Sequence, residues 1–154
     1  MTTIRRTRVA DAPVLRELTK EGVAREAARH PEDRIGISDA GLDNLETHYR
    51  LGAAHPDLIT VIAEDEGEIV GFVDAEITRG RSLPGVGGEI GDLYVSEGAG
   101  AGVAEALVRE AVRWLRDHGA GPIFHTEDAA HPELEPWESL GFEADVVRFS
   151  LYVE

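Results

Sequence analysis

The sequence predicts an α/β protein of the α+β type, with a mixed, mostly antiparallel central sheet and helices on both of its faces. Three observations lead to this prediction. Segments rich in β-branched residues alternate with segments of helical periodicity, two of the former make a hairpin at the centre of the chain, and a glycine-rich turn joins a strand to an amphipathic helix. Because both faces of a sheet must be covered, we expect the helices to pack on both.

The first third of the chain predicts a strand followed by two helices. Residues 3–9 alternate as a short strand does, and Asp11 and Pro13 suit the N-cap and first turn of a helix that runs to about His30. After a polar break, a second helix is expected to begin near Ser38. The apolar side chains expected on the buried faces are Val14, Leu15, Leu18, Val23 and Ala27 in the first helix, and Leu42, Leu45, Tyr49 and Leu51 in the second.

The middle of the chain predicts a hairpin and a third strand. Residues 58–63 are rich in β-branched side chains, residues 65–68 contain the glycine of a turn, and residues 69–77 return as the second strand. A loop with four glycines and a proline is expected over residues 80–88, and a strand over residues 89–95.

The last third predicts two more helices and further strands. A helix follows the glycine turn from Val103 and ends at Gly119, a residue type that commonly terminates helices. Residues 122–126 are expected to form a strand, residues 132–140 a short helix, and residues 143–153 one or two closing strands. No repeat, linker or low-complexity stretch interrupts this order, so we expect one domain over residues 1–154.

Composition and charge narrow the class of partner. The chain has no cysteine, which excludes disulfides, thiolate metal sites and a cysteine nucleophile. Thirty acidic residues against fifteen basic ones give a formal charge of −15, a sign that repels phosphate backbones and anionic lipids and favours cationic small molecules. We therefore expect no nucleic-acid and no membrane partner, although an acidic surface also serves solubility alone. The N-terminus lacks the apolar stretch of a signal peptide, so a cytoplasmic location is expected.

The glycine turn, residues 98–102, is the most informative stretch. A strand that enters a helix through small residues presents unpaired backbone N–H groups and the positive end of the helix dipole, which together can bind an anion such as a pyrophosphate. The Gly-Lys-Ser/Thr of a Walker loop is absent, because the turn ends in Gly-Val-Ala. A dinucleotide-binding site remains an alternative, with Glu127 as the acid that would bind a ribose.

Two motifs in order resemble the GNAT superfamily of N-acetyltransferases. The family's acyl-CoA-binding motif is similar to the stretch from Leu93-Tyr94-Val95 through Gly100-Ala101-Gly102-Val103-Ala104 to Ala106-Leu107. Its second motif, usually Tyr-Glu-x-Leu-Gly-Phe, resembles Trp137-Glu138-Ser139-Leu140-Gly141-Phe142, and the helix and strand between the two motifs agree as well. With the N-terminal Ile4-Arg5-Arg6 and Asp11-Ala12, the resemblance covers essentially the whole chain.

The resemblance implies the GNAT fold and transfer of an acetyl or other acyl group from acyl-CoA to a primary amine of a small molecule or peptide. The amine would attack the thioester directly, so catalysis would rest on positioning and on proton transfer. The strand before the glycine turn would part from its neighbour to admit the pantetheine arm, and a homodimer is a family expectation. The residues expected to contact acetyl-CoA are Leu93, Tyr94, Val95, Ala99, Gly100, Ala101, Gly102, Val103, Ala104 and Trp137.

The chain departs from the family pattern at several positions. Ala99 stands where the loop usually begins with arginine or glutamine, and the segment before it is one residue short. Trp137 replaces the tyrosine that often protonates the departing thiolate, and the usual asparagine falls near Ala130, with Asp128 and His131 close by. Neither Tyr94 nor Tyr152 matches the tyrosine position. A non-catalytic acyl-CoA-binding protein of the same fold is therefore the alternative to an enzyme.

Three side chains are candidate catalytic groups. A carboxylate of Glu89 or Asp92 would accept the amine proton, but residues three apart in a regular strand point to opposite faces, so both can face the acyl group only if a bulge intervenes. His125, at the end of a strand, is a candidate base, with a hydrogen bond to a neighbouring loop as the plainer alternative. His48 and Tyr49 are candidates for the acceptor pocket. The histidines lack metal-ligand spacing, so no metal site is expected.

Overall fold

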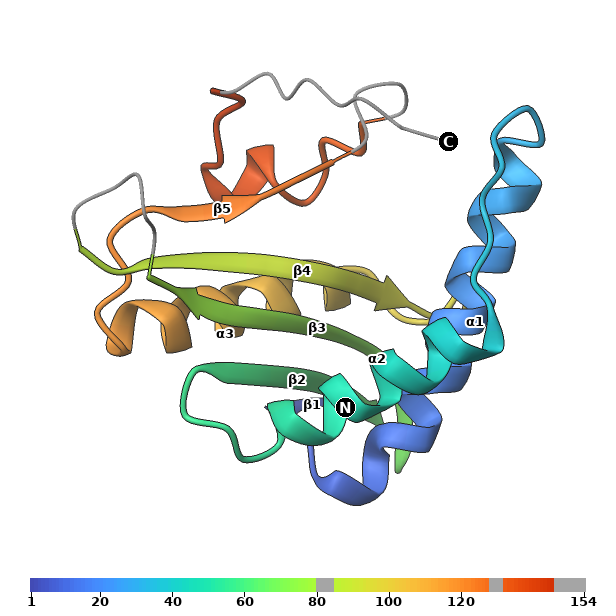
Figure 1. Ribbon diagram of the computed structural model, residues 1–154, viewed down its shortest axis with the longest axis horizontal. Helices are drawn as coiled ribbons and strands as arrows, with labels where there is room; N and C mark the ends of the chain where they lie inside the picture. Colours follow the sequence, from blue (N-terminus) through green and yellow to red (C-terminus); the bar gives the residue numbers. More distant parts are fainter. Residues whose placement is uncertain (80–84, 128–131, 146–154) are drawn as a thin grey trace.

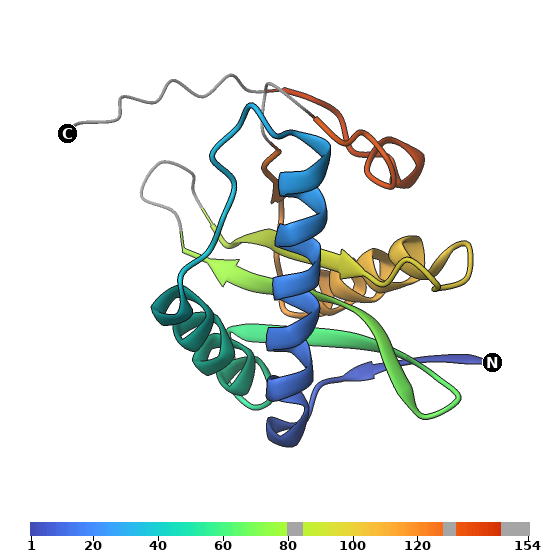
Figure 2. The same cartoon turned by 90° about the vertical axis from the view of Figure 1, so that its right-hand side faces the viewer.

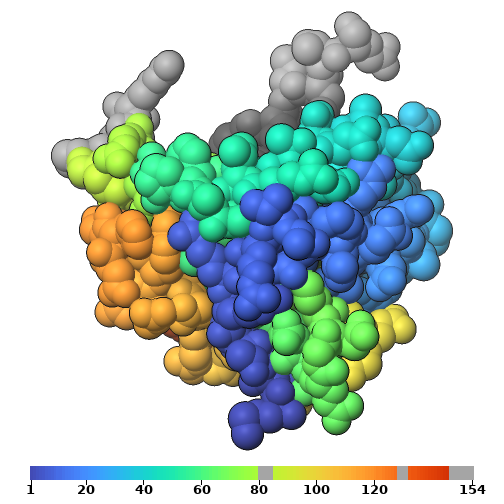
Figure 3. All heavy atoms as spheres, turned by 90° about the horizontal axis from the view of Figure 1, so that it is seen from below, coloured from blue at the N-terminus to red at the C-terminus, as the bar shows by residue number. Residues whose placement is uncertain are grey.

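A five-stranded sheet with the order β1-β2-β3-β4-β5 forms the centre of the protein (Figure 1). The computed structural model describes residues 1–79, 85–127 and 132–145. The first four strands are antiparallel neighbours, and the fifth lies parallel to the fourth. Their bounds are β1 Thr2–Arg6, β2 Leu58–Asp65, β3 Glu68–Thr78, β4 Gly87–Val95 and β5 Ile123–His125. The predicted mixed, mostly antiparallel sheet is confirmed. Figure 3 looks onto the β1 edge, where the N-terminal segment lies beside the β2–β3 turn.

Helices cover both faces of this sheet (Figures 1 and 2). Helices α1 (Ala12–Arg29) and α2 (Asp39–Gly52) pack on one face, and α3 (Val103–Asp117) packs on the other. Neighbouring residues of β2 show the alternation: Val61 belongs to the cluster under α3, and Ile62 to the cluster under α1 and α2. None of the helices in the described ranges is long and apolar enough to cross a membrane.

A bulge interrupts β4 at its centre. Ile90 pairs with Ala75 and Leu93 pairs with Val73, so Gly91 and Asp92 together face the single residue Asp74 of β3. Ile90 and Leu93 both pack in the cluster under α3, whereas Tyr94 packs under α1 and α2. The extra residue therefore places Asp92 on the same face as Glu89 and Tyr94, which a regular strand would not do.

The structure corrects several boundaries in the first half. The first strand ends at Arg6 instead of residue 9, and Asp11 does not cap α1 through its side chain but accepts the backbone N–H of Arg8 at 2.7 Å. Val14 and Leu51 were expected on buried faces, yet they are 44% and 48% exposed because the helices bury narrower stripes. The predicted start at Ser38 is confirmed, since its hydroxyl accepts the backbone N–H of Gly41.

The helix expected over residues 132–140 is wrong. Only a single 3-10 turn, Glu138–Leu140, forms there. Pro136 has no backbone N–H and disfavours helical geometry at the residue before it, so a continuous helix does not form through this segment. Residues 143–145 are not strand, and the remainder of the predicted closing strands, with Tyr152, lies outside the described residues, as do Asp128, Ala130 and His131.

Candidate functional site

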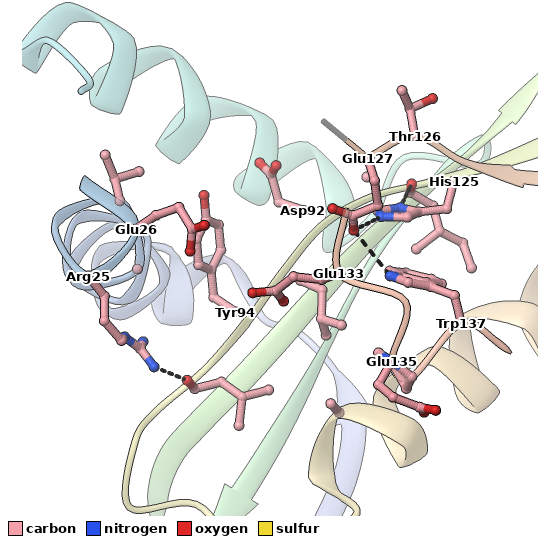
Figure 4. A pocket seen from close by; sticks show the side chains of 18 of the residues that line it. Arg25, Glu26, Asp92, Tyr94, His125, Thr126, Glu127, Glu133, Glu135 and Trp137 are labelled. Carbon is pink, nitrogen blue, oxygen red and sulfur yellow. Dashed lines mark hydrogen bonds and ion pairs between the residues drawn. The ribbon is translucent and has the colours of Figure 1, made fainter. Parts of the chain in front are cut away.

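The site lies where β4 and β5 part. The described part of β5 pairs with β4 only at Gly88, Glu89 and Ile90, so the β4 edge from Gly91 to Val95 is left without a strand partner there. A pocket of about 550 Å³ opens at this place. It lies between α1, β4, the end of β5 and residues 133–137, as Figure 4 shows. An unpaired strand edge offers backbone N–H and C=O groups to an extended ligand.

The glycine turn leaves room for a ligand at the start of α3. A Cβ added to Gly98, Gly100 or Gly102 would meet no atom within 4 Å, so the backbone there is open to close approach. Gly102 is the N-cap of α3 with φ 84°, and it has no side chain that could satisfy the first amides of the helix. These features suit the pyrophosphate of an acyl-CoA, whose oxygens would accept hydrogen bonds from those amides.

The residues expected to bind acetyl-CoA divide into two groups. Leu93, Tyr94, Val95, Ala104 and Trp137 line the pocket. The others belong to the turn outside its lining, where the side chain of Ala99 packs against the core and that of Val103 is buried in it. Only backbone groups of these two can therefore reach a ligand. The roles of all ten residues in binding acetyl-CoA stay predictions.

Arg25 of α1 reaches the same strand edge and was missed by the sequence reasoning. Its guanidinium donates a hydrogen bond of 3.0 Å to the carbonyl oxygen of Val95 (Figure 4). This bond ties α1 to the end of β4 and occupies one of the backbone groups that the pantetheine arm was expected to use. No local pattern in the sequence indicates a contact between residues so far apart.

Asp92 has the properties of a proton acceptor. Burial, and next the neighbouring charge of Asp74, raise its pKa from 3.8 to about 6 against the opposing effect of His48 and His125. A carboxylate with a pKa close to neutral pH is suited to general base catalysis. Glu89 also lines the pocket from β4. The bulge thus brings both candidate carboxylates to one face.

A second buried carboxylate supports this arrangement. Asp74 is 7% exposed, and its Oδ2 lies 3.2 Å from Nε2 of His48, whose pKa is raised by this hydrogen bond. Its Oδ1 has no hydrogen-bond partner among the described residues. His48 therefore contacts a buried carboxylate of β3, but neither residue lines the pocket, so the place of His48 at the acceptor stays a prediction. Tyr49 does not line the pocket either, because it is fully buried and its hydroxyl bonds Oγ1 of Thr19.

His125, Glu127 and Trp137 form a third group, at the β5 side of the pocket (Figure 4). The rings of His125 and Trp137 are stacked, with centroids 3.5 Å apart and an interplanar angle of 16°. Nε2 of His125 lies 2.6 Å from Oε1 of Glu127, and the indole N–H of Trp137 donates to the same oxygen at 3.1 Å. Trp137 therefore packs both against the core and beside the pocket.

Among the described residues one group has metal-ligand geometry. His30, Glu32 and Asp33 follow α1 and bring their ligand atoms within 4.8 Å of one another. The ring nitrogens of His30 lie 3.3 Å from a carboxylate oxygen of Glu26 and 3.7 Å from one of Glu32.

The sequence held a signal for one of the missed residues. Asp74 is a single carboxylate within the apolar run Gly71-Phe72-Val73-Asp74-Ala75, and a buried charge in a central strand usually has a specific partner. No local pattern around Glu127 indicates its contacts with His125 and Trp137.

Comparisons with known proteins agree with this geometry. The sequence matches the Acetyltransferase (GNAT) family over residues 25–142, and no curated protein matches it. Similar solved structures include a transcriptional regulator from Bacillus halodurans, with 19% identity, a TM-score of 0.74, and coverage of 99% of this chain and 100% of that one.

Two further structures are described as acetyltransferases. One is a predicted acetyltransferase with acetyl-CoA from Clostridium acetobutylicum, with 17% identity, a TM-score of 0.78, and coverage of 99% of this chain and 96% of that one. The other is an aminoglycoside acetyltransferase from an uncultured soil metagenomic sample, with 20% identity, a TM-score of 0.70, and coverage of 100% and 99%. The structural likeness shows the fold, and the match over most of the sequence shows that this chain belongs to the GNAT acetyltransferase family.

Proposed function

We propose that this protein binds acetyl-CoA and transfers the acetyl group to a primary amine of a cationic small molecule or peptide. The observation that carries the proposal is the position of Asp92, a carboxylate with a pKa of about 6, in the bulge beside the unpaired edge of β4. A base is needed here because an amine that attacks a carbonyl must lose a proton.

The residues of the split strand and the turn would hold acetyl-CoA. Leu93 and Val95 would offer backbone groups to the pantetheine arm. The amides between Gly100 and Ala104 would bind the pyrophosphate, except that of Val103, which like that of Ala99 already donates to a backbone carbonyl of the turn. When bound, acetyl-CoA supplies the activated acyl group. Asp92 would accept the proton from the attacking amine, directly or through a water molecule. The backbone N–H near Val95 would polarise the acyl carbonyl.

The charge of the pocket supports a cationic acceptor. Acidic side chains dominate its lining, and the two arginines there have partners: Arg25 bonds Val95, and Arg29 forms ion pairs with Glu26 and Glu133. The acidic residues of the lining are Glu26, Glu89, Asp92, Glu127, Glu133 and Glu135. A ligand with several amino groups would be attracted to such a surface. Two structural neighbours are described as aminoglycoside acetyltransferases, which is consistent with an acceptor of this kind.

A non-catalytic acyl-CoA-binding protein is the competing hypothesis, and Ala99 and Trp137 favour it. Asp92 favours the enzyme, because burying a carboxylate raises its energy and nothing in a pure binding role requires it. A dinucleotide site is less well supported, because the carboxylate of Glu127 is already engaged. It contacts Nε2 of His125 and accepts a hydrogen bond from the indole N–H of Trp137.

The test is release of free CoA thiol in the presence of acetyl-CoA and a panel of amines. The panel should contain polyamines, aminoglycosides, lysine-containing peptides and a neutral alcohol of similar size. We expect amine-dependent release that is fastest with polycationic acceptors. Binding of acetyl-CoA without amine-dependent release across the panel would favour the non-catalytic protein.

A further inference from the structure

Both ring nitrogens of His125 face hydrogen-bond acceptors. Nδ1 lies 2.9 Å from the backbone carbonyl oxygen of Ile90, and Nε2 lies 2.6 Å from Oε1 of Glu127. A carbonyl oxygen can only accept, so Nδ1 carries a proton. An ionised carboxylate can also only accept, so Nε2 carries a second one if Glu127 is charged.

The carboxylate of Glu127 is the acceptor for two neighbouring rings. Oε1 also accepts the indole N–H of Trp137 at 3.1 Å, so two donors converge on one oxygen. The side chain is 34% exposed, so water can solvate the rest of the carboxylate. The face of Trp137 lies against the His125 ring at a centroid separation of 3.5 Å and fixes its orientation. Both ring nitrogens of His125 are therefore directed at acceptors, which places the ring to donate protons rather than to accept them.

The position of this ring matches a function that the pocket otherwise lacks. His125 is the last residue of β5, and its partner Ile90 is the last residue of β4 before the bulge, so the ring lies at the point where the strands part. The His125 side chain is 11% exposed and lines the pocket. Trp137, at the position where the resembling motif has its proton-donating tyrosine, contacts the ring but has an N–H that is not acidic at ordinary pH.

We propose that His125 is the acid that protonates the thiolate of CoA as it leaves. The proposal rests on the proposed function and replaces the expectation that His125 acts as a base. The nitrogen–carbon bond forms and the carbon–sulfur bond breaks, with its electron pair going to sulfur. His125 gives its Nε2 proton to that sulfur, so the hydrogen bond from Nε2 to Glu127 breaks, while Nδ1–H keeps its bond to Ile90. Asp92 takes the proton of the amine, and exchange with water restores both side chains.

Other charged groups share the pocket and will influence its pH dependence. The titratable and charged side chains that line it, besides His125 and Glu127, are Glu89, Asp92 and Tyr94 from β4, Arg25, Glu26, Arg29 and His30 from the end of α1, and Glu133 and Glu135 from the segment before Trp137. Of these, Asp92 interacts electrostatically with His125. A variant that acts through His125 must therefore be distinguished from one that acts through Asp92.

Two variants and a control test the proposal. Glu127→Gln keeps the size of the side chain, and its amide can donate to Nε2, which allows a neutral ring. His125→Gln removes the acid. His118→Gln is the matched control, because His118 also stacks on a tryptophan, Trp114, at 4.1 Å, yet lies outside the pocket.

The first readout needs no turnover. Nitrogen NMR of the free protein at pH 7.5, with the His125 signals assigned through His125→Gln, should show both ring nitrogens protonated in the wild type and one of them deprotonated in Glu127→Gln. A singly protonated ring in the wild type would overturn the proposal, and this result is obtained whether or not a variant is active.

The second readout is kcat with saturating acetyl-CoA and amine. We expect His125→Gln to lower kcat by about 10²-fold or more, with acetyl-CoA affinity within about threefold of the wild type. His118→Gln should match the wild type. An unchanged kcat in His125→Gln would contradict the role of His125 as the acid and leave the proposed acetyl transfer standing. Absence of acetyl-CoA binding by the wild type would overturn the proposed function, and the role of His125 with it.

Discussion

Gly91 lies directly against the carboxylate of Asp74. A Cβ added at position 91 would be 2.5 Å from Oδ1 of Asp74, the oxygen that has no hydrogen-bond partner among the described residues. The bulge that turns Asp92 into the pocket therefore depends on a residue without a side chain, since the buried carboxylate on β3 fills the space where one would be.

Replacement of this glycine should destabilise the protein. We expect Gly91→Ala to lower the free energy of unfolding by about 1–3 kcal/mol, because Asp74 or the bulge must shift to admit the methyl group. Urea denaturation with a common m-value measures the change. Gly36→Ala is the control, because a Cβ there meets nothing within 4 Å. Equal stability of the two variants would contradict the close packing at the bulge.

Asp92 should control the acid limb of the reaction. Because its pKa is about 6 and the ionised form accepts the proton, kcat/KM should rise as the pH increases through about 6. Asp92→Asn should lower kcat/KM by about 10²–10⁴-fold and remove this limb, with acetyl-CoA affinity retained. Glu89→Gln provides the comparison on the same strand. A limb near pH 6 that persists in Asp92→Asn would assign the base to another group.

The same substitution should stabilise the fold at neutral pH. The pKa of Asp92 is higher in the folded protein than its ordinary value of 3.8, so the folded state binds the proton more tightly. Ionisation therefore costs stability: the penalty is absent below pH 3.8, grows between 3.8 and 6, and is constant above. A rise from 3.8 to about 6 corresponds to at most roughly 3 kcal/mol. Melting of the wild type and Asp92→Asn at pH 4 and pH 8 measures the difference. If Asp92→Asn raises the melting temperature over that of the wild type by no more at pH 8 than at pH 4, the result would be inconsistent with a buried charge at Asp92.

The glycine turn should contribute affinity through the pyrophosphate. Gly100 has open space around its α-carbon, so Gly100→Val should fold normally while its side chain keeps the pyrophosphate away from the amides. We expect the acetyl-CoA dissociation constant to rise by about tenfold or more, equivalent to ~1.4 kcal/mol. Acetyl-pantetheine, which lacks the pyrophosphate, should bind the variant and the wild type equally. An equal loss for both ligands would place the effect elsewhere.

Much of the fold could be predicted because local patterns decide it. The β-branched run at residues 58–63 and the turn around Gly67 predict the hairpin, and the apolar stripe from Val103 to Leu115 predicts α3. The failures have local causes that periodicity does not register. Pro136 keeps residues before it out of a helix, and the apolar side chains of Val14 and Leu51 fall just outside the buried stripes.

The site could be predicted only in part, because its central relationships join distant segments. The sequence indicated that Glu89 and Asp92 share a face only if a bulge intervenes, and nothing local showed that Gly91 would be held against Asp74 to make one. The bond from Arg25 to Val95 joins residues on different elements, and the partners of His125 become evident only when β5 is placed beside Ile90. Residue types were predictable, whereas these contacts depend on packing.

The most direct test of the central claim is a thermal-shift titration of the wild type with acetyl-CoA, CoA and NAD. A ligand at about a hundred times its dissociation constant should stabilise the folded state by roughly 2.7 kcal/mol. For a chain of this size the melting temperature should then rise by roughly 5–10 °C. We expect this rise with acetyl-CoA and with CoA and none with NAD. No rise with either CoA ligand at millimolar concentration would contradict the assignment of the split between β4 and β5 as an acyl-CoA site, and the proposed acetyl transfer with it.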